Sequence, residues 1–144
     1  MKILVVEDDF VARNVYNEYL RPYGVCDGAE NGLVGLNAFK FALDCGKPYK
    51  LICLDISMPE MDGQTLLREI RKYEAEKGIT GSEGVKVIMT TAHNDYHNIM
   101  TAFIGQCEGY IIKPIGKEKL LQQMKKLGLI DDGILGGPAP RENT

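Results

Sequence analysis

The sequence contains no tryptophan, so intrinsic tryptophan fluorescence cannot follow ligand binding. It also lacks any Cys-X-X-Cys pair, and its cysteines are scattered, so neither a zinc site nor a disulfide framework is indicated. Two of these cysteines, Cys53 and Cys107, lie in or beside apolar segments, where we expect buried and reduced thiols.

Long apolar runs are also missing. No segment approaches the ~20 residues of a membrane span, and no secretory signal is present, because the apolar residues 3–6 are followed at once by three acids. We therefore expect a cytoplasmic protein without a membrane partner. The net charge is −3 and no basic cluster occurs, so direct binding to nucleic acid is not expected.

What is present suits one globular domain. The chain has 144 residues, of which 44% are hydrophobic and 26% charged, an ordinary balance for a folded protein with one core. Short apolar runs rich in β-branched residues predict strands, with the weakest signal in the second of them. The predicted strands are 2–6, 25–29, 50–54, 85–90 and 109–112.

Segments with helical spacing alternate with these strands. In the first, Val11, Val15 and Tyr19 lie on one face, and Gly128 is the expected C-cap of the last. The alternation predicts an α/β fold of the (βα)5 type, a parallel sheet with helices on both faces. Residues 1–130 would form this domain, and residues 131–144, rich in Gly and Pro, a flexible tail. The predicted helices are 10–21, 33–44, 63–77, 95–106 and 117–127.

Polar residues follow the predicted strands, whose carboxyl ends meet at one edge of such a sheet. Each has a simpler interpretation: an Asp can cap a helix or begin a turn, a Thr can be a plain strand residue, and a Lys a solvated charge. Together they favour a functional site, because every well-predicted strand delivers a polar group to the same edge. The residues are Glu7, Asp8, Asp9, Asp55, Thr90, Thr91 and Lys113.

A cluster of acids repels itself unless a cation intervenes, and Lys113 alone supplies too little positive charge. Oxygen ligands without His or Cys favour Mg²⁺, or alternatively Mn²⁺, over zinc. Such a site typically handles phosphoryl groups, and a carboxylate can itself be the nucleophile that forms an aspartyl-phosphate.

Four motifs carry a family resemblance: VVEDD at 5–9, LDISMPEMDG at 54–63, TTAH at 90–93 and GYIIKPI at 109–115. In order and approximate spacing they resemble the receiver domain of two-component response regulators, of which the stand-alone chemotaxis regulator is a small member. The resemblance spans roughly residues 1–128. It implies a doubly wound, flavodoxin-like sheet with strand order 2-1-3-4-5, an order for which such a regulator is a standard example.

The resemblance also implies roles for single residues. Asp55 resembles the phosphoacceptor, and Lys113 the ammonium that pairs with it, preceding a proline through a cis peptide bond. Thr91 resembles the switch hydroxyl, and Tyr110 the aromatic switch residue, although a Tyr packed half-buried on an edge strand remains its alternative interpretation. The implied Mg²⁺ ligands are Asp8, Asp9, Asp55 and the backbone carbonyl of Ser57.

The sequence departs from the family pattern in two places. The segment between Asp55 and Thr91 is longer than usual, with extra polar residues around 74–84, which predicts an extended third helix or loop away from the site. Ile115 stands where an aromatic is common. One alternative function is that of a dehalogenase-type phosphatase, which also uses an aspartate nucleophile. Such a phosphatase would require a carboxylate at position 57, where Ser stands. The other alternative is a receiver-like module that binds proteins without phosphorylation.

The resemblance implies a phosphoacceptor that assists its own phosphorylation and slow autodephosphorylation, rather than an ordinary enzyme. Its phosphodonor would be a sensor histidine kinase or a phosphotransfer protein, and its output an effector protein that the sequence does not identify. We expect either a stand-alone receiver or a receiver unit of a larger protein.

Overall fold

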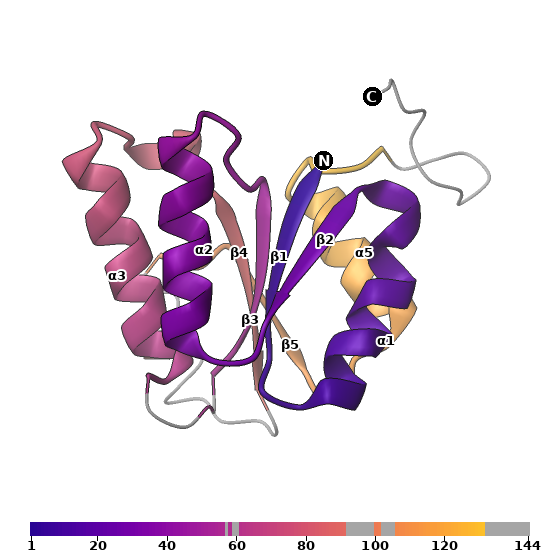
Figure 1. Ribbon diagram of the computed structural model, residues 1–144. Coiled ribbons are helices and arrows are strands. Elements are labelled where there is room, and N and C mark those ends of the chain that lie inside the picture. The colour runs from indigo at the N-terminus through magenta and orange to yellow at the C-terminus, as the bar shows by residue number, and fades with distance from the viewer. Residues whose placement is uncertain (57, 59–60, 92–99, 102–105, 132–144) are drawn as a thin grey trace.

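The computed structural model describes residues 1–56, 58, 61–91, 100–101 and 106–131. Five parallel strands form one sheet with the order β2-β1-β3-β4-β5, so the predicted doubly wound fold and strand order are confirmed (Figure 1). Each strand lies within one residue of its predicted position. The strands are β1 (Lys2–Val6), β2 (Val25–Ala29), β3 (Leu51–Asp55), β4 (Lys86–Thr91) and β5 (Gly109–Ile112).

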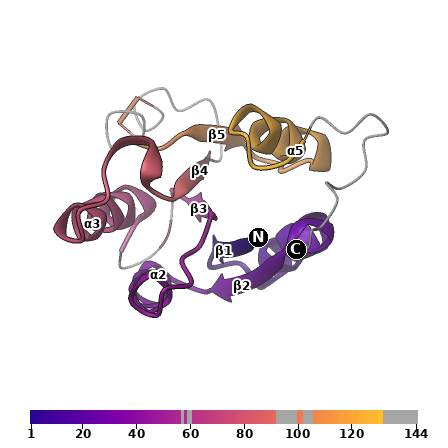
Figure 2. The ribbon, with the colours of Figure 1, turned by 90° about the horizontal axis from the view of Figure 1, so that it is seen from above.

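Helices cover both faces of the sheet (Figure 2). Helices α1 (Phe10–Leu20) and α5 (Lys117–Lys126) lie on one face, and α2 (Gly32–Asp44) and α3 (Gly63–Glu76) on the other. Short 3-10 turns, η1 (Arg21–Tyr23) and η2 (Gly81–Glu83), precede β2 and β4. No helix in the described ranges is long and apolar enough to cross a membrane.

Two predicted segments fall largely outside the described residues. Of the helix predicted over 95–106, the structure describes Met100 and Thr101, which are helical, and Gln106, which forms a turn. Of the tail predicted over 131–144, it describes Asp131 alone.

The hydrophobic core lies on both faces of the central strands. All five residues of β3 are buried, which is why this run is apolar up to Asp55. Edge strand β2 is mostly exposed, and this explains its weak signal in the sequence. The predicted buried thiols are confirmed, because Cys53 and Cys107 are both buried and free.

The buried face of α1 differs from the predicted one. The structure buries Tyr16 and Leu20 against the sheet, whereas Val11 is 66% exposed and Val15 and Tyr19 are only partly buried. Both sets of residues have the spacing of neighbours on one helical face, so spacing alone does not show which of the two faces is buried. The buried face therefore carries a phenol hydroxyl toward the sheet.

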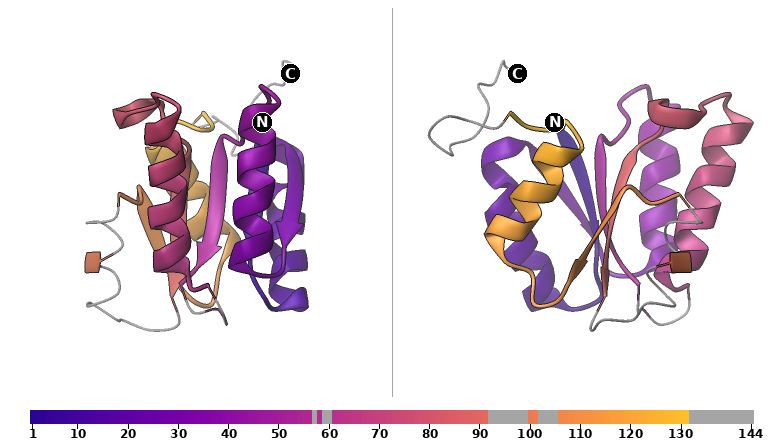
Figure 3. Two further views of the ribbon diagram at one scale, coloured as in Figure 1. Left: turned by 60° about the vertical axis from the view of Figure 1, so that its left-hand side comes forward. Right: turned by 180° about the vertical axis from the view of Figure 1, so that it is seen from behind.

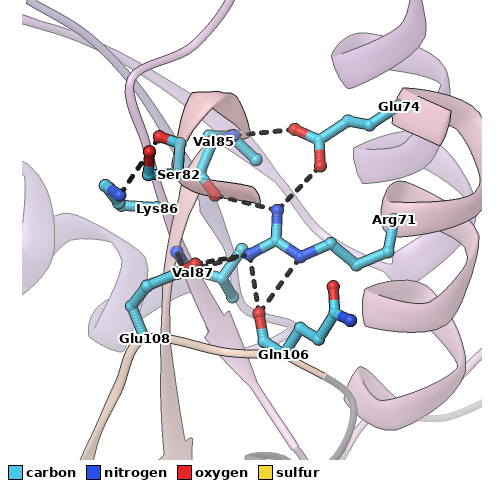
Figure 4. Close-up of polar contacts among 8 residues, drawn as sticks. All are labelled: Arg71, Glu74, Ser82, Val85, Lys86, Val87, Gln106 and Glu108. Atoms are coloured by element: carbon cyan, nitrogen blue, oxygen red, sulfur yellow. Dashed lines mark hydrogen bonds and ion pairs between the residues drawn. The ribbon is translucent and has the colours of Figure 1, made fainter. Parts of the chain in front are cut away.

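A buried ionic network joins α3 to the amino-terminal ends of β4 and β5 (Figure 4). Arg71 pairs with Glu74 at 2.8 Å and with Glu108 at 2.9 Å. Glu74 also accepts the Val85 N–H at 2.7 Å, and Glu108 accepts the Val87 N–H at 2.7 Å. The extended segment predicted after α3 thus lies at the edge of the sheet opposite the carboxyl ends of the strands, as Figure 3 shows from behind.

Candidate functional site

Three acidic side chains converge at the carboxyl ends of β1 and β3. Carboxylate oxygens of Glu7, Asp8 and Asp55 all lie within 4.8 Å of one another. Asp55 ends β3, and Glu7 continues the ladder of β1 because its N–H donates to the Ala29 carbonyl at 3.0 Å. Glu7 and Asp55 are buried, with exposures of 1% and 4%, whereas Asp8 is exposed to solvent. The cluster therefore opens to solvent through Asp8.

Lys113, just beyond β5, reaches the same cluster. Its Nζ lies 3.2 Å from Asp55 Oδ2, to which it donates a hydrogen bond, and 3.5 Å from Glu7 Oε1. Its backbone N–H donates to the Thr91 carbonyl at 2.7 Å, and the peptide bond to Pro114 is cis, as predicted. One ammonium thus faces three carboxylates.

Among these carboxylates, Glu7 has a raised pKa. Burial, with a smaller contribution from the Asp55 charge, raises the pKa of Glu7 to about 7, although the Asp9 N–H at 3.1 Å and Lys113 oppose the rise. Burial alone would lower the pKa of Lys113, but the carboxylates of Asp55 and Glu7 outweigh it and raise that pKa. The lysine therefore stays charged beside the acids.

Asp9 has a different local role from its two neighbours. Its Oδ2 accepts the Ala12 N–H at 2.9 Å, so it is the N-cap of α1, the simpler of the interpretations open to it from the sequence. The side chain that completes the acid cluster in the described part of the chain is Glu7. The hydrogen-bond ladder of β1 continues through Glu7 and so turns the Glu7 side chain inward, whereas Asp9 begins the helix. This continuation distinguishes the acid of the cluster from the acid that caps α1.

Of the other predicted site residues, the structure describes two threonines and a tyrosine. Thr91 ends β4 and is 4% exposed, and Thr90 beside it is fully buried. Tyr110 is partly buried on edge strand β5 and packs against the core cluster beneath α2 and α3. Ser57, whose carbonyl is a predicted ligand, lies outside the described residues.

The donor set suits a hard divalent cation. Oε1 of Glu7 is buried and accepts no hydrogen bond from the described residues, with the Lys113 ammonium as its ion-pair partner. Carboxylate oxygens without His or Cys favour Mg²⁺ or Mn²⁺. An acidic cluster that contains a buried acceptor and an exposed carboxylate can hold such a cation while leaving it accessible from solvent.

Comparisons with known proteins identify the family of this chain. The sequence matches the response regulator receiver domain family over residues 3–125. It is 32% identical over 129 residues to the transcriptional regulatory protein AruR of Pseudomonas aeruginosa, covering 88% of this chain and 48% of that protein. It is 28% identical over 127 residues to the chemotaxis protein CheY of Bacillus subtilis, covering 87% of this chain and 95% of CheY. Several relatives are longer: the chain spans about half of AruR.

Solved structures share the fold. The receiver domain of Ssk1 from Saccharomyces cerevisiae, crystallised with the phosphotransfer protein Ypd1, has a TM-score of 0.77 at 23% identity, covering 93% of this chain and 92% of that one. CheY of Borrelia burgdorferi, crystallised with CheX, BeF3 and Mg²⁺, has a TM-score of 0.76 at 22% identity, with 89% of each chain covered. From its sequence and its fold, the chain belongs to the response regulator receiver domain family of two-component signalling.

Proposed function

We propose that Asp55 accepts a phosphoryl group from a phosphohistidine of a sensor histidine kinase or a phosphotransfer protein, and that this modification switches a partner-binding surface. The observation that carries the proposal is the buried Asp55 carboxylate, 3.2 Å from the Lys113 ammonium and within 4.8 Å of two further carboxylates. A structural role for Asp55 would not require additional acids beside it, because each one destabilises the others.

The transfer uses the side chains of this site in distinct ways. An Asp55 oxygen forms a bond to phosphorus as the phosphorus–nitrogen bond of the donor breaks and the imidazole leaves. The Lys113 ammonium, already paired with Asp55, then pairs with the added phosphoryl oxygens and offsets their negative charge. The chain would thereby assist its own phosphorylation, and we include slow autodephosphorylation in the proposal.

The residues proposed to hold the cation are Glu7, Asp8 and Asp55, with the Ser57 carbonyl as a further ligand by family resemblance. We prefer Glu7 to Asp9 because the Asp9 carboxylate is used as a helix cap. Mg²⁺ bound there supplies positive charge that offsets both the acids and the phosphoryl oxygens.

The output is proposed to follow from the added charge, about −1.5 to −2 for a phosphoryl group near pH 7. That charge recruits the Thr91 hydroxyl at the end of β4, and Tyr110 on β5 repacks in response, which changes the surface around β5 and α5. We take residues 1–130 as the receiver unit and the cytoplasm as its place of action, where it would meet its phosphodonor and an effector protein.

The proposal is tested by incubating the chain with acetyl phosphate and Mg²⁺ and measuring its intact mass. We expect a gain of one phosphoryl group in the parent, no gain for Asp55→Asn, and no gain when EDTA removes the cation. Asp62→Asn is the matched control, because Asp62 is an exposed N-cap whose role Asn can keep. An unmodified parent would favour the phosphorylation-independent binding module instead, and an Asp55→Asn variant labelled like the parent would contradict the choice of Asp55 as the phosphoacceptor.

A further inference from the structure

Three buried polar atoms without hydrogen-bond partners lie in the described part of the chain: Glu7 Oε1, the Tyr16 hydroxyl and Thr90 Oγ1. Their residues are 1%, 2% and 0% exposed. Buried polar atoms of folded proteins are nearly always hydrogen-bonded to protein or to ordered water, so each of these atoms calls for a physical explanation.

All three groups lie on the same side of the sheet. Tyr16 belongs to the core cluster beneath α1 and α5, together with Val5 and Ile88. Because side chains two residues apart on a strand point to the same face, Glu7 follows Val5 and Thr90 follows Ile88 toward this cluster. Thr90 also pairs in register with Asp55. The two hydroxyl groups therefore lie on the inner side of the acid cluster.

The phenol of Tyr16 is within electrostatic reach of its polar neighbours. Burial raises the pKa of Tyr16 most, Cys53 and, more weakly, the charges of Glu7 and Asp55 add to the rise, and the Thr90 side chain opposes it as a hydrogen-bond partner. The hydroxyls of Tyr16 and Thr90 are therefore close to each other, although they are not aligned for a good direct hydrogen bond. Glu7, Tyr16 and Lys113 also line one cavity of about 620 Å³ between α1 and the residues after β5.

We propose that Glu7 Oε1, the Tyr16 hydroxyl and the Thr90 hydroxyl share one buried water molecule, and that this site orients Glu7 for cation binding. A buried water is stable when it has two to four polar partners, and here two hydroxyls and a carboxylate oxygen supply three of them. Hydrogen bonds to a carboxylate that binds a metal fix its orientation and favour its charged form. Tyr16 is thus a positioning residue that acts through Glu7, and the inference rests on the proposed function.

The matched pair of variants is Tyr16→Phe and Tyr19→Phe. Each removes one hydroxyl from α1, but Tyr19 is only partly buried and lies nearly one helical turn away. We expect Tyr16→Phe to weaken Mg²⁺ binding about three- to tenfold, the fold-change that corresponds to losing one hydrogen bond of ordinary strength. Tyr19→Phe should bind Mg²⁺ like the parent. Thr90→Val tests the same site from the other hydroxyl and should also weaken binding.

Calorimetric titration with MgCl₂ measures these affinities, and proton NMR supplies a signature that packing changes do not produce. In the parent, the slowly exchanging Tyr16 hydroxyl proton should show a cross-peak to a long-lived water and should shift when Mg²⁺ is added. A parent that does not bind Mg²⁺ contradicts the proposed cation site itself. A parent that binds Mg²⁺, with Tyr16→Phe and Thr90→Val binding equally well, overturns the present inference and leaves the proposed function standing.

Discussion

The amino ends of the strands form one edge of the sheet (the amino edge), and their carboxyl ends form the other (the carboxyl edge). The two edges differ in how completely their ionised side chains are paired. At the amino edge, the Arg71 guanidinium donates to Glu74, Glu108 and two backbone carbonyls, those of Gln106 at 2.7 Å and Val85 at 2.9 Å (Figure 4). The two carboxylates in turn accept backbone N–H groups of the β4 region. Nearly every polar atom of this network has a partner inside the protein.

At the carboxyl edge, three carboxylates face one ammonium, and a buried oxygen of Glu7 accepts no hydrogen bond from the described residues. The comparison separates two uses of buried charge. Charges that hold elements together are matched by the fold, whereas charges reserved for a ligand stay in excess until the ligand arrives. Binding sites commonly reduce the stability of the free protein in this way.

The largest expected effect comes from breaking the matched edge. Arg71→Ala removes the cation that the carboxylates of Glu74 and Glu108 share, and their side chains are only 6% and 26% exposed. Removing one partner of a buried ionic network typically costs about 3–5 kcal/mol, and we expect that loss in the free energy of unfolding measured with guanidinium chloride. A loss no larger than that of an exposed ion pair would contradict the structural role given to this network.

The next largest loss of stability is expected from a substitution at the start of α3, where its backbone packs closely against the end of β3. A Cβ at Gly63 would lie 2.4 Å from the Asp55 carbonyl oxygen, so Gly63→Ala should shift the end of β3 or the start of α3. We expect a loss of about 1–3 kcal/mol in unfolding free energy, together with slower labelling by acetyl phosphate. Gly116→Ala is the control, because nothing lies within 4 Å of its added Cβ. Equal stability of the two variants would show that the close approach is not required.

Removing one of the excess charges at the carboxyl edge should stabilise the fold, whereas the two preceding substitutions should destabilise it. Because the folded-state pKa of Glu7 is about 7 against an ordinary 4.5, folding stability should fall as the pH rises from about 4.5 to about 7. Glu7→Gln removes this loss, and with EDTA present it should be more stable than the parent at pH 8 by about 1–3 kcal/mol. Urea unfolding at pH 4 and pH 8 measures the difference. A variant less stable than the parent at pH 8 would show that Glu7 is not under electrostatic strain.

The smallest effect is expected away from both edges. Arg21 pairs with Glu18 at 2.6 Å, but the two side chains are 70% and 69% exposed. Arg21→Ala should therefore change the free energy of unfolding by no more than about 0.5 kcal/mol. Compared with Arg71→Ala, this variant separates the effect of burial from the effect of removing any arginine. A loss of stability similar to that of Arg71→Ala would contradict the claim that burial makes the Arg71 network important.

Much of the fold could be predicted from local pattern. Strand β3 is apolar throughout because both of its faces are buried, and the polar side chains that follow the strands gather at one edge because parallel strands all end there. The helix caps were harder, because Asp8 and Asp9 are equivalent by residue type. Only the continuation of the β1 ladder through Glu7 decides which acids turn inward.

Other features depend on contacts between residues far apart in the sequence. Arg71 and Glu108 are 37 positions apart, and no local pattern joins them. The burial of Tyr16 in place of Val15 depends on how α1 is rotated against the sheet, which hydropathy alone does not fix because both residues are apolar enough for the core. Glu74 on α3 is buried, and charged residues are seldom buried without a partner, but that burial is visible only in the structure.

The most direct test of the account locates the modification itself. After reaction with acetyl phosphate and Mg²⁺, borohydride reduction converts an acyl phosphate of aspartate into homoserine, which peptide mass spectrometry can place in the sequence. Homoserine is expected at position 55 only when donor and Mg²⁺ are both present. Homoserine at position 8 or 9, or none at position 55 in a folded and cation-bound chain, would contradict the claim that the excess charge at the carboxyl edge serves phosphorylation of Asp55.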